Sequence, residues 1–334
     1  MIILNPQTQA LITGLCKGKS HIKLTVGAYC DGEITIKVFN ETHEVPNEGY
    51  VYEIGSITKT FTASLLAKYV FEQKMSLEDS IQKYISGLDD NVYYPTLRRL
   101  ATHTAGYPCN LVPMSVAKRI KLIIDNLFAR QGQGELPLQM DFEKMKALIE
   151  KYKLSDKDYP YQYSNFGIAL LGYAVGVVSG KGYWDEMSDF ISDELGLTNT
   201  YLGIRESNLH GYNRKNQDIG NWNWNKDLFS PAGCISSTAE DLLEFARLNM
   251  YDEIPFLSLC HQKLADCEQF DMGLAWRISK QKKHVLQHTG ETDMFSSFLV
   301  VDKENKRATT VLANYGVDIS KLAQIGVSIL KNMS

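Results

Sequence analysis

The sequence predicts an α/β fold of the α+β type, in which one antiparallel sheet is built from the N- and C-terminal segments, with helices flanking it and an all-helical lobe inserted. Three observations predict it: strand-like segments near both termini, a helical middle, and a length of 334 residues, which exceeds the usual single core. We expect a sheet lobe formed by residues 1–60 and 266–334, a mainly helical lobe formed by 61–265, and an active site in the cleft between them.

The N-terminal part of the sheet is predicted to be a β-hairpin. Residues 22–29 and 33–39 are rich in β-branched side chains and flank an Asp-Gly turn at 31–32. In the second arm, Ile34, Ile36 and Val38 alternate with polar residues, so we expect one face of this strand to be buried.

The middle of the chain is predicted to be helical because capping signals lead into periodic apolar runs. Helices are expected over 57–73 and 166–178, and residues 104–142 are expected to form an irregular excursion on the substrate side. The end of the chain returns to strands, separated by turns at 280–282 and 302–306 and followed by an amphipathic helix. The expected strands are 272–279, 283–287, 295–301 and 307–313, and the helix is 319–331.

Composition and charge exclude several classes of function. A formal net charge of −4 and a pI near 6.0 leave no electrostatic footprint for nucleic acid. No stretch approaches the roughly 18 apolar residues of a spanning helix, and no export signal is recognisable, so we expect a cytoplasmic protein, exported if a leader has been removed. The six cysteines show no regular framework, which suggests reduced thiols.

A serine and a lysine stand three residues apart at the start of an apolar helical run. In a helix over 57–73, Ser56 lies at the N-terminus and Lys59 one turn on, so that the amine can reach the hydroxyl. Partial burial and the positive end of the helix dipole both disfavour the ammonium and lower its pKa. The pair is therefore a candidate nucleophile and general base.

This spacing is not specific by itself, because five other serine–lysine pairs share it. They are Ser20/Lys23, Ser80/Lys83, Ser115/Lys118, Ser279/Lys282 and Ser328/Lys331. The alternative interpretation is an N-cap serine beside a solvated lysine. Gly55, which allows close backbone approach, and the apolar face behind Ser56 favour the catalytic interpretation.

Two further motifs follow in sequence order. Tyr163-Ser164-Asn165 is the only Tyr-x-Asn in the chain and opens an apolar helical run. His288-Thr289-Gly290 is the only Lys- or His-Thr-Gly and lies between two strand-like segments. Without the motif, Tyr163 reads as a packing residue and Asn165 as a helix N-cap.

With these motifs the chain resembles the penicillin-recognising serine hydrolases: class C β-lactamases, DD-peptidases, and the related esterases and D-aminopeptidases. The segments 97–106, 230–233 and 237–242 are also similar to segments of that group. The resemblance covers most of residues 20–315 and implies a β-lactamase/transpeptidase-like fold. Within the first of these segments, His103 is expected to brace the helical lobe.

The resemblance implies a serine hydrolase that acts through an acyl-enzyme on an ester, amide or D-amino-acid peptide. Ser56 would be the nucleophile, and Lys59 and Tyr163 would both take part in proton transfer. Either of these two could be the general base. Asn165 would hydrogen-bond Lys59 and the substrate. The backbone N–H groups of Ser56 and Glu291 would bind the oxyanion.

The third motif departs from the β-lactamases and DD-peptidases, which usually carry lysine where this chain has His288. A mostly neutral imidazole is a poorer anchor for a substrate carboxylate near pH 7. Thr289 and Gly290 complete the motif, and the acidic Glu291 and Asp293 follow it. We therefore expect tolerance for neutral or amine-bearing substrates, unless both acids point into solvent.

Several rival interpretations remain open. Within the family they are a class C-like β-lactamase or DD-carboxypeptidase and a non-catalytic penicillin-binding or sensor protein. A zinc site using Cys260, Cys267, His284 and His288 is disfavoured, because the two histidines would lie about 13 Å apart along a strand. An α/β-hydrolase lacks its Gly-x-Ser-x-Gly elbow. We expect no cofactor and no metal, and a small-molecule or peptide substrate as the partner.

Overall fold

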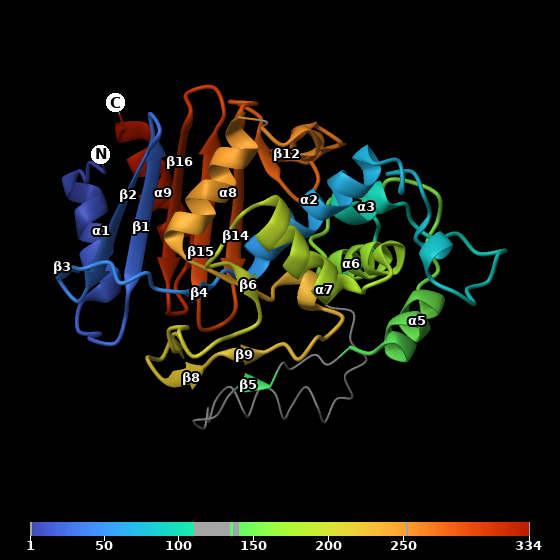
Figure 1. Ribbon diagram of the computed structural model, residues 1–334, viewed down its shortest axis with the longest axis horizontal. Coiled ribbons are helices and arrows are strands. Elements are labelled where there is room, and N and C mark those ends of the chain that lie inside the picture. Colours follow the sequence, from blue (N-terminus) through green and yellow to red (C-terminus); the bar gives the residue numbers. More distant parts are fainter. Residues whose placement is uncertain (1, 110–133, 136–139, 252, 334) are drawn as a thin grey trace.

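The computed structural model describes residues 2–109, 134–135, 140–251 and 253–333. Its centre is a nine-stranded antiparallel sheet in the order β11-β12-β13-β14-β15-β16-β1-β2-β3 (Figure 1). The N-terminal strands β1 and β2 therefore continue a sheet that the C-terminal strands begin. This confirms the predicted α/β fold with a large antiparallel sheet built from both ends of the chain.

The predicted hairpin is present as β1 (Leu24–Cys30) and β2 (Glu33–Asn40), which pair directly and continue to β3 (His43–Val45). Asp31 and Gly32 have φ of 54° and 84°, as a tight turn with two left-handed residues requires. The expected burial of one face holds only in part. Val38 is buried, whereas Ile34, close to the start of the strand, is 40% exposed.

The C-terminal strands differ from the predicted ones at two places. The segment 272–279 is two short strands, β12 (Phe270–Met272) and β13 (Arg277–Ser279), because the chain between them turns through Ala275 at φ 56°. The strand predicted over 283–287 runs further, as β14 (Val285–Glu291), and includes the whole third motif. The remaining strands are β11 (Ala265–Asp266), β15 (Ser296–Asp302) and β16 (Arg307–Ala313).

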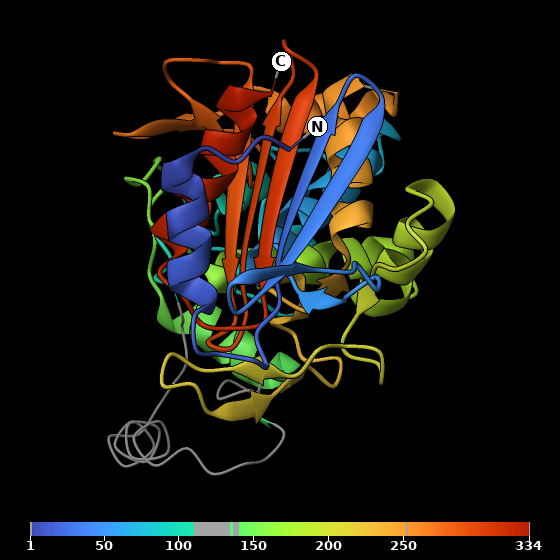
Figure 2. The ribbon, with the colours of Figure 1, turned by 90° about the vertical axis from the view of Figure 1, so that its left-hand side faces the viewer.

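Helices cover both faces of the sheet (Figure 2). The helix α8 (Ala239–Tyr251) packs on β1, β15 and β16, while α9 (Ile319–Asn332) packs on the opposite face together with α1 (Pro6–Cys16). Side chains of β15 alternate accordingly: Phe298 and Val300 join the core under α1 and α9, and Leu299 joins the larger core. The predicted C-terminal amphipathic helix is thereby confirmed.

The remaining helices gather beside the sheet, on the right in Figure 1. They are α2 (Thr58–Phe71), α3 (Leu97–Ala101), α5 (Phe142–Lys151), α6 (Asn165–Ser179) and α7 (Tyr183–Asp189). Almost every side chain of α2 is buried, as expected of a central helix that packs on α6 and on the turn Pro255–His261.

The middle of the chain also contains short strands that the sequence did not predict. Three of them, β4 (Tyr52–Glu53), β10 (Ile235–Ser237) and β6 (Tyr201–Leu202), form a small sheet beside the start of α2. The others pair as β5 (Gly134–Glu135) with β9 (Trp222–Asn223) and β7 (Gly211–Tyr212) with β8 (Asp218–Gly220). Most of the expected excursion at 104–142 lies outside the described residues, and the lobe boundaries near 60 and 266 stay a prediction.

Within the described ranges no single helix is long and apolar enough to cross a membrane. Only the consecutive helical segments Asn165–Ser179 and Tyr183–Glu194 would meet that test together, and they are bent by 77° relative to each other.

Candidate active site

Ser56 lies in a single 3-10 turn, Gly55–Ile57, that leads directly into α2. Its Oγ accepts a hydrogen bond from Lys59 Nζ at 2.8 Å, as the spacing of the two residues predicts. Neither the turn nor α2 has a side-chain cap, so the interpretation of Ser56 as an N-cap is wrong. The serine is partly exposed while its neighbours are buried, which leaves the hydroxyl accessible to a substrate.

Two glycines allow this turn to lie against the edge of the sheet. Gly55 has a φ of 49°, and a Cβ there would lie 2.8 Å from the backbone nitrogen of Glu291. A Cβ on Gly290 would lie 2.0 Å from the carbonyl oxygen of Ile54. Larger residues at either position would push β14 and the turn apart. Ser297 of β15 secures the contact, because its Oγ donates to the same Ile54 oxygen at 2.8 Å.

This close contact brings together the two backbone segments expected to bind an oxyanion. Ser56 follows Gly55, and Glu291 is the last residue of β14, so the nucleophile and the end of the strand lie side by side. The assignment of the Ser56 and Glu291 N–H groups as oxyanion donors stays a prediction.

Lys59 is completely buried, so the alternative of a solvated lysine is wrong. Its Nζ donates a second hydrogen bond, at 2.6 Å, to the carbonyl oxygen of Ala232. Burial lowers the pKa of Lys59 to about 7, and the nearby positive charge of Arg277 lowers it further, against an opposing effect of Cys109. Near neutral pH a substantial fraction of this amine is therefore unprotonated and able to accept a proton.

Tyr163 lies beside the serine–lysine pair. Lys59 Nζ is 4.9 Å from the centroid of the tyrosine ring. Burial raises the pKa of Tyr163 well above its usual range, while a hydrogen bond with the Ser56 hydroxyl acts in the opposite direction. The three side chains that the sequence predicts to converge are therefore in contact, and the phenol is in its protonated form at neutral pH.

Asn165 is placed differently from expectation. The N-cap of α6 is Ser164, whose Oγ accepts from the backbone N–H of Gly167 at 3.0 Å, so the interpretation of Asn165 as the cap is wrong. Its backbone N–H donates to the carbonyl oxygen of Cys109, and its amide lies 3.8 Å from the Cys109 sulfur. Within the described part of the chain Lys59 donates to Ser56 and Ala232, and the expected hydrogen bond between Lys59 and Asn165 is not among its contacts.

His103 braces the segment that carries Tyr163, as predicted. Its Nδ1 accepts from the backbone N–H of Ser164 at 3.2 Å, and its carbonyl oxygen accepts from Gln162. Its ring lies 4.8 Å from the ring of Tyr163. Burial, with added repulsion from Lys59 and Arg277, lowers the pKa of His103 to about 3, so the imidazole is neutral.

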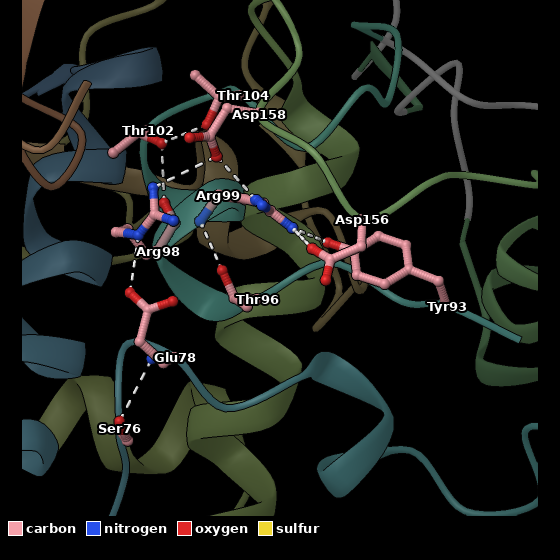
Figure 3. A network of polar contacts seen from close by, with 10 residues as sticks. All are labelled: Ser76, Glu78, Tyr93, Thr96, Arg98, Arg99, Thr102, Thr104, Asp156 and Asp158. Atoms are coloured by element: carbon pink, nitrogen blue, oxygen red, sulfur yellow. Dashed lines mark hydrogen bonds and ion pairs between the residues drawn. The ribbon is translucent and has the colours of Figure 1, made fainter. Parts of the chain in front are cut away.

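Surface ion pairs and hydrogen bonds anchor the segment just before Tyr163 to α3 (Figure 3). Arg99 donates to Asp156 at 2.6 Å and to Asp158 at 2.8 Å, and Arg98 joins Asp158 to Glu78. These ion pairs tie residues 156–158, shortly before Tyr163, to α3, which ends two residues before His103. The network therefore fixes the segment that carries Tyr163 relative to His103.

His288 is buried on β14, and its ring nitrogen Nδ1 donates to the carbonyl oxygen of Thr289 at 2.7 Å. Burial holds the pKa of His288 well below its usual range, and the positive charges of Arg277 and Lys59 act in the same direction. The neutral imidazole expected from the sequence is therefore present. It supplies no positive charge for a substrate carboxylate.

The acidic edge expected after the third motif is partly neutralised. Glu291 Oε1 accepts from Arg214 Nη2 at 2.6 Å, so its charge is paired. The pKa of Asp293 is raised, first by desolvation and then by repulsion from Glu291.

A family model described as Beta-lactamase matches residues 41–325, well over half of the chain. The chain belongs to the beta-lactamase family. It is 30% identical to a beta-lactamase of Lysobacter lactamgenus over 205 residues, which are 60% of this chain and 47% of the relative. The chain thus spans about half the length of this curated relative.

Solved structures show that the fold is that of class C beta-lactamases. One such enzyme superposes with a TM-score of 0.79 over 98% of this chain and 97% of the other, at 20% identity. A protein described as beta-lactamase/D-alanine carboxypeptidase from Pseudomonas syringae superposes with a TM-score of 0.78 over 98% of both chains, at 17% identity.

In this beta-lactamase-family protein, sequence reasoning missed two residues of the site. Ala232, whose carbonyl oxygen accepts from Lys59, lies in the segment 230–233, but a backbone acceptor leaves no side-chain signal. Arg277 pairs with Gln287 across β13 and β14, and its guanidinium lies 5.3 Å from the ring centroid of Phe270. No motif pointed to it.

The residues of the rival metal site have other partners in the beta-lactamase-family fold. His284 Nδ1 lies 2.6 Å from a Glu304 carboxylate oxygen, and Cys260 is buried near the carbonyl oxygen of Ala63. The described residues contain no group of three or more histidine, cysteine or acidic side chains that could hold a metal ion.

Proposed function

We propose that this protein is a serine hydrolase that acts through an acyl-enzyme intermediate on an ester, an amide or a D-amino-acid peptide. The observation that carries the proposal is the hydrogen bond between Ser56 Oγ and the buried Nζ of Lys59. A buried lysine that touches a partly exposed serine, with a tyrosine beside both, fits an activated nucleophile and has no evident structural use.

Lys59 is favoured over Tyr163 as the general base. The pKa of Lys59 falls to about 7, so the amine can be neutral, whereas the pKa of Tyr163 is raised and the phenolate is disfavoured. Neutral Lys59 would take the proton of Ser56 while Ser56 Oγ forms a bond to the substrate carbonyl carbon. The resulting oxyanion would accept from the N–H groups of Ser56 and Glu291.

The proton then moves to the leaving group. Tyr163 would donate its phenolic proton to the departing alkoxide or amine as the carbonyl–leaving group bond breaks, and would recover a proton from Lys59. Water would attack the acyl-enzyme along the reverse route and release the acid. The Ala232 carbonyl keeps one hydrogen of the amine engaged, so that the lone pair of neutral Lys59 faces Ser56.

Intact-mass spectrometry tests this proposal. We expect incubation with a mixed set of penicillins, activated esters and D-amino-acid amides to add one acyl mass, located in the peptide that contains Ser56. Turnover of at least one donor distinguishes the hydrolase from a non-catalytic binding protein, for which a burst of product without turnover is expected. An adduct on another residue would refute the assignment of Ser56.

Arg277 favours a second candidate, a carboxylate-bearing acyl donor such as a DD-carboxypeptidase or β-lactamase substrate. It forms no ion pair within the described residues, and its charge lowers the pKa of Lys59, His103 and His288. Because Arg214 pairs with Glu291, the net charge at this site is more positive than the acidic residues in the sequence indicate. The expected preference for neutral or amine-bearing donors therefore loses support.

Replacing Arg277 separates these candidates. In Arg277→Met we expect kcat/KM for a carboxylate-bearing donor to fall about 10- to 100-fold, the value of one charge-assisted hydrogen bond. A neutral p-nitrophenyl ester should change by less than about threefold. Both are measured at pH 8, where Lys59 is mostly neutral.

The matched control is Arg247→Met, in which the lost charge is paired with Glu244 and Glu253 at the end of α8, outside the site. We expect no charge-selective effect there. Equal losses for both donors in Arg277→Met would contradict a role in recognising a carboxylate and would restore the preference for neutral donors.

We also propose a cytoplasmic location. Cys16, Cys234 and Cys260 are buried and form no disulfide, which agrees with a reducing compartment. Burial raises the pKa of the Cys16 thiol to about 11 and that of Cys260 to about 12, so these thiols are unreactive. Localisation of a tagged full-length protein in cell fractions tests this.

A further inference from the structure

Glu53 is a buried carboxyl group three residues before Ser56 that the mechanism above does not use. It lies on β4, opposite Ser236 of β10, and is 2% exposed. Its Oε1 accepts from the backbone N–H of Trp222 at 2.8 Å. Its Oε2 is also buried but has no hydrogen-bond partner among the residues that the structure describes. A buried carboxylate oxygen without a partner is costly, so it needs an explanation.

A second unpartnered group lies at the end of β14. Thr292 follows Glu291, the residue whose N–H is the proposed oxyanion donor. Its Oγ1 is buried and forms no hydrogen bond within the described part of the chain. The carbonyl oxygen of Thr292 accepts from the indole N–H of Trp222 at 2.5 Å, and its backbone N–H donates to Phe295. Trp222 therefore links Glu53, through its backbone, to Thr292, through its side chain.

The groups that face the Glu53 carboxyl are uncharged hydrogen-bond donors. Trp222 N–H, the Thr292 hydroxyl and the Asn221 amide each lower its pKa, but burial outweighs them and raises it to about 7. The charged residues nearest in sequence on these segments, Glu291 and Asp293, are not among the causes of the shift.

We propose that Glu53 is a positioning residue whose ionised carboxylate accepts a hydrogen bond from the Thr292 hydroxyl at Oε2. Together with the two hydrogen bonds of Trp222, this contact holds the end of β14 so that the Glu291 N–H points at the oxyanion beside Ser56. The inference rests on the proposed function. The unpartnered Oε2 and Oγ1 are then the two halves of one hydrogen bond that closes in the reacting enzyme, where such contacts commonly tighten.

Ionisation strengthens this contact, because a carboxylate accepts charge-assisted hydrogen bonds from the Trp222 N–H, the Thr292 hydroxyl and the Asn221 amide. The protonated form carries no charge and has less acceptor capacity, so it binds the same donors more weakly. The contact is therefore closed above a pH of about 7 and open below it. Below pH 7 the rate is limited by two deprotonations, that of Lys59 and that of Glu53.

The pH profile of Glu53→Gln tests the proposal. Below pH 7 the slope of log kcat/KM against pH should fall from near two in the wild type to near one. At pH 8.5 kcat should fall about 10- to 100-fold with KM within about threefold, as expected when a reacting group is misplaced slightly. The matched control is Glu186→Gln, which removes a buried carboxylate bonded to Tyr69 and should leave the slope unchanged. An unchanged slope in Glu53→Gln would overturn the proposal.

Variants of Thr292 test the other half of the contact. Thr292→Val should lower kcat as Glu53→Gln does, and Thr292→Ser, which keeps the hydroxyl, should restore most of it. Because both residues act through one hydrogen bond, the double variant should lose little more than either single variant. Losses that multiply in the double variant would contradict the proposed coupling, as would failure of Thr292→Ser to rescue.

A readout independent of turnover separates this inference from the proposed function. The fluorescence of Trp222, taken as the difference between wild type and Trp222→Phe, should titrate with a midpoint near pH 7 and should lose that titration in Glu53→Gln. A titration without hydrolysis would refute the hydrolase but retain the Glu53 contact. Hydrolysis with a titration that persists in Glu53→Gln would refute the contact alone.

Discussion

Ser56→Ala abolishes turnover: we expect kcat to fall on the order of 10⁶-fold, to the background set by binding alone. Alanine has no oxygen to form the acyl bond, and in the proposed mechanism Lys59 and Tyr163 only move the proton of Ser56 Oγ, so neither can replace it. The measurement is steady-state hydrolysis together with intact mass, in which the acyl adduct should disappear.

The control for this variant is Ser20→Ala, an exposed serine with the same spacing to a lysine, Lys23. It should retain wild-type activity, which shows that the loss depends on the contact with a buried lysine and not on the spacing. Melting temperatures of both variants should stay close to that of the wild type, since Ser56 is partly exposed and caps no helix. Substantial turnover by Ser56→Ala would refute the acyl-enzyme proposal.

Lys59→Met should remove activity and stabilise the protein at the same time. We expect kcat/KM to fall about 10²- to 10⁴-fold or more, since the general base is lost. The melting temperature should rise by several degrees at pH 6, because a buried ammonium is replaced by an apolar chain of similar length. A group kept for catalysis at the expense of stability behaves in this way.

The pH dependence of that gain follows from the direction of the shift. The pKa of Lys59 is about 7 in the folded state and 10.5 in its unperturbed state, so between these values the unfolded chain binds a proton that the folded chain does not. Wild-type stability therefore rises with pH through this window. The advantage of Lys59→Met should be largest below pH 7 and should vanish above about pH 10.5.

Differential scanning calorimetry at several pH values measures this gain. Lys68→Met is the control, since Lys68 lies on the same helix but pairs with Glu194 at the surface. It should change neither activity nor the pH dependence of stability, because surface ion pairs contribute little. A melting temperature of Lys59→Met that falls at pH 6 would show that the buried amine stabilises the fold.

Much of the fold could be predicted from short-range patterns. The Asp31-Gly32 turn selects a tight hairpin, and the strands predicted over 295–301 and 307–313 are present as β15 and β16, which are buried on both faces. Less could be predicted where strands are only two or three residues long. Such strands carry too few residues for a periodicity and form because partners distant in the sequence supply the hydrogen bonds, as Ser236 does for Glu53.

The candidate site, like the fold, could be predicted only in part from the sequence. The sequence by itself determined the motifs around Ser56, Tyr163 and His288, since their spacing and order are local properties of the chain. Only the tertiary structure decided that Lys59 is buried against Ala232 and that Arg277 lies close enough to lower the pKa of Lys59. Burial and charge balance depend on residues brought together by folding, and these set the pKa values on which the chemistry depends.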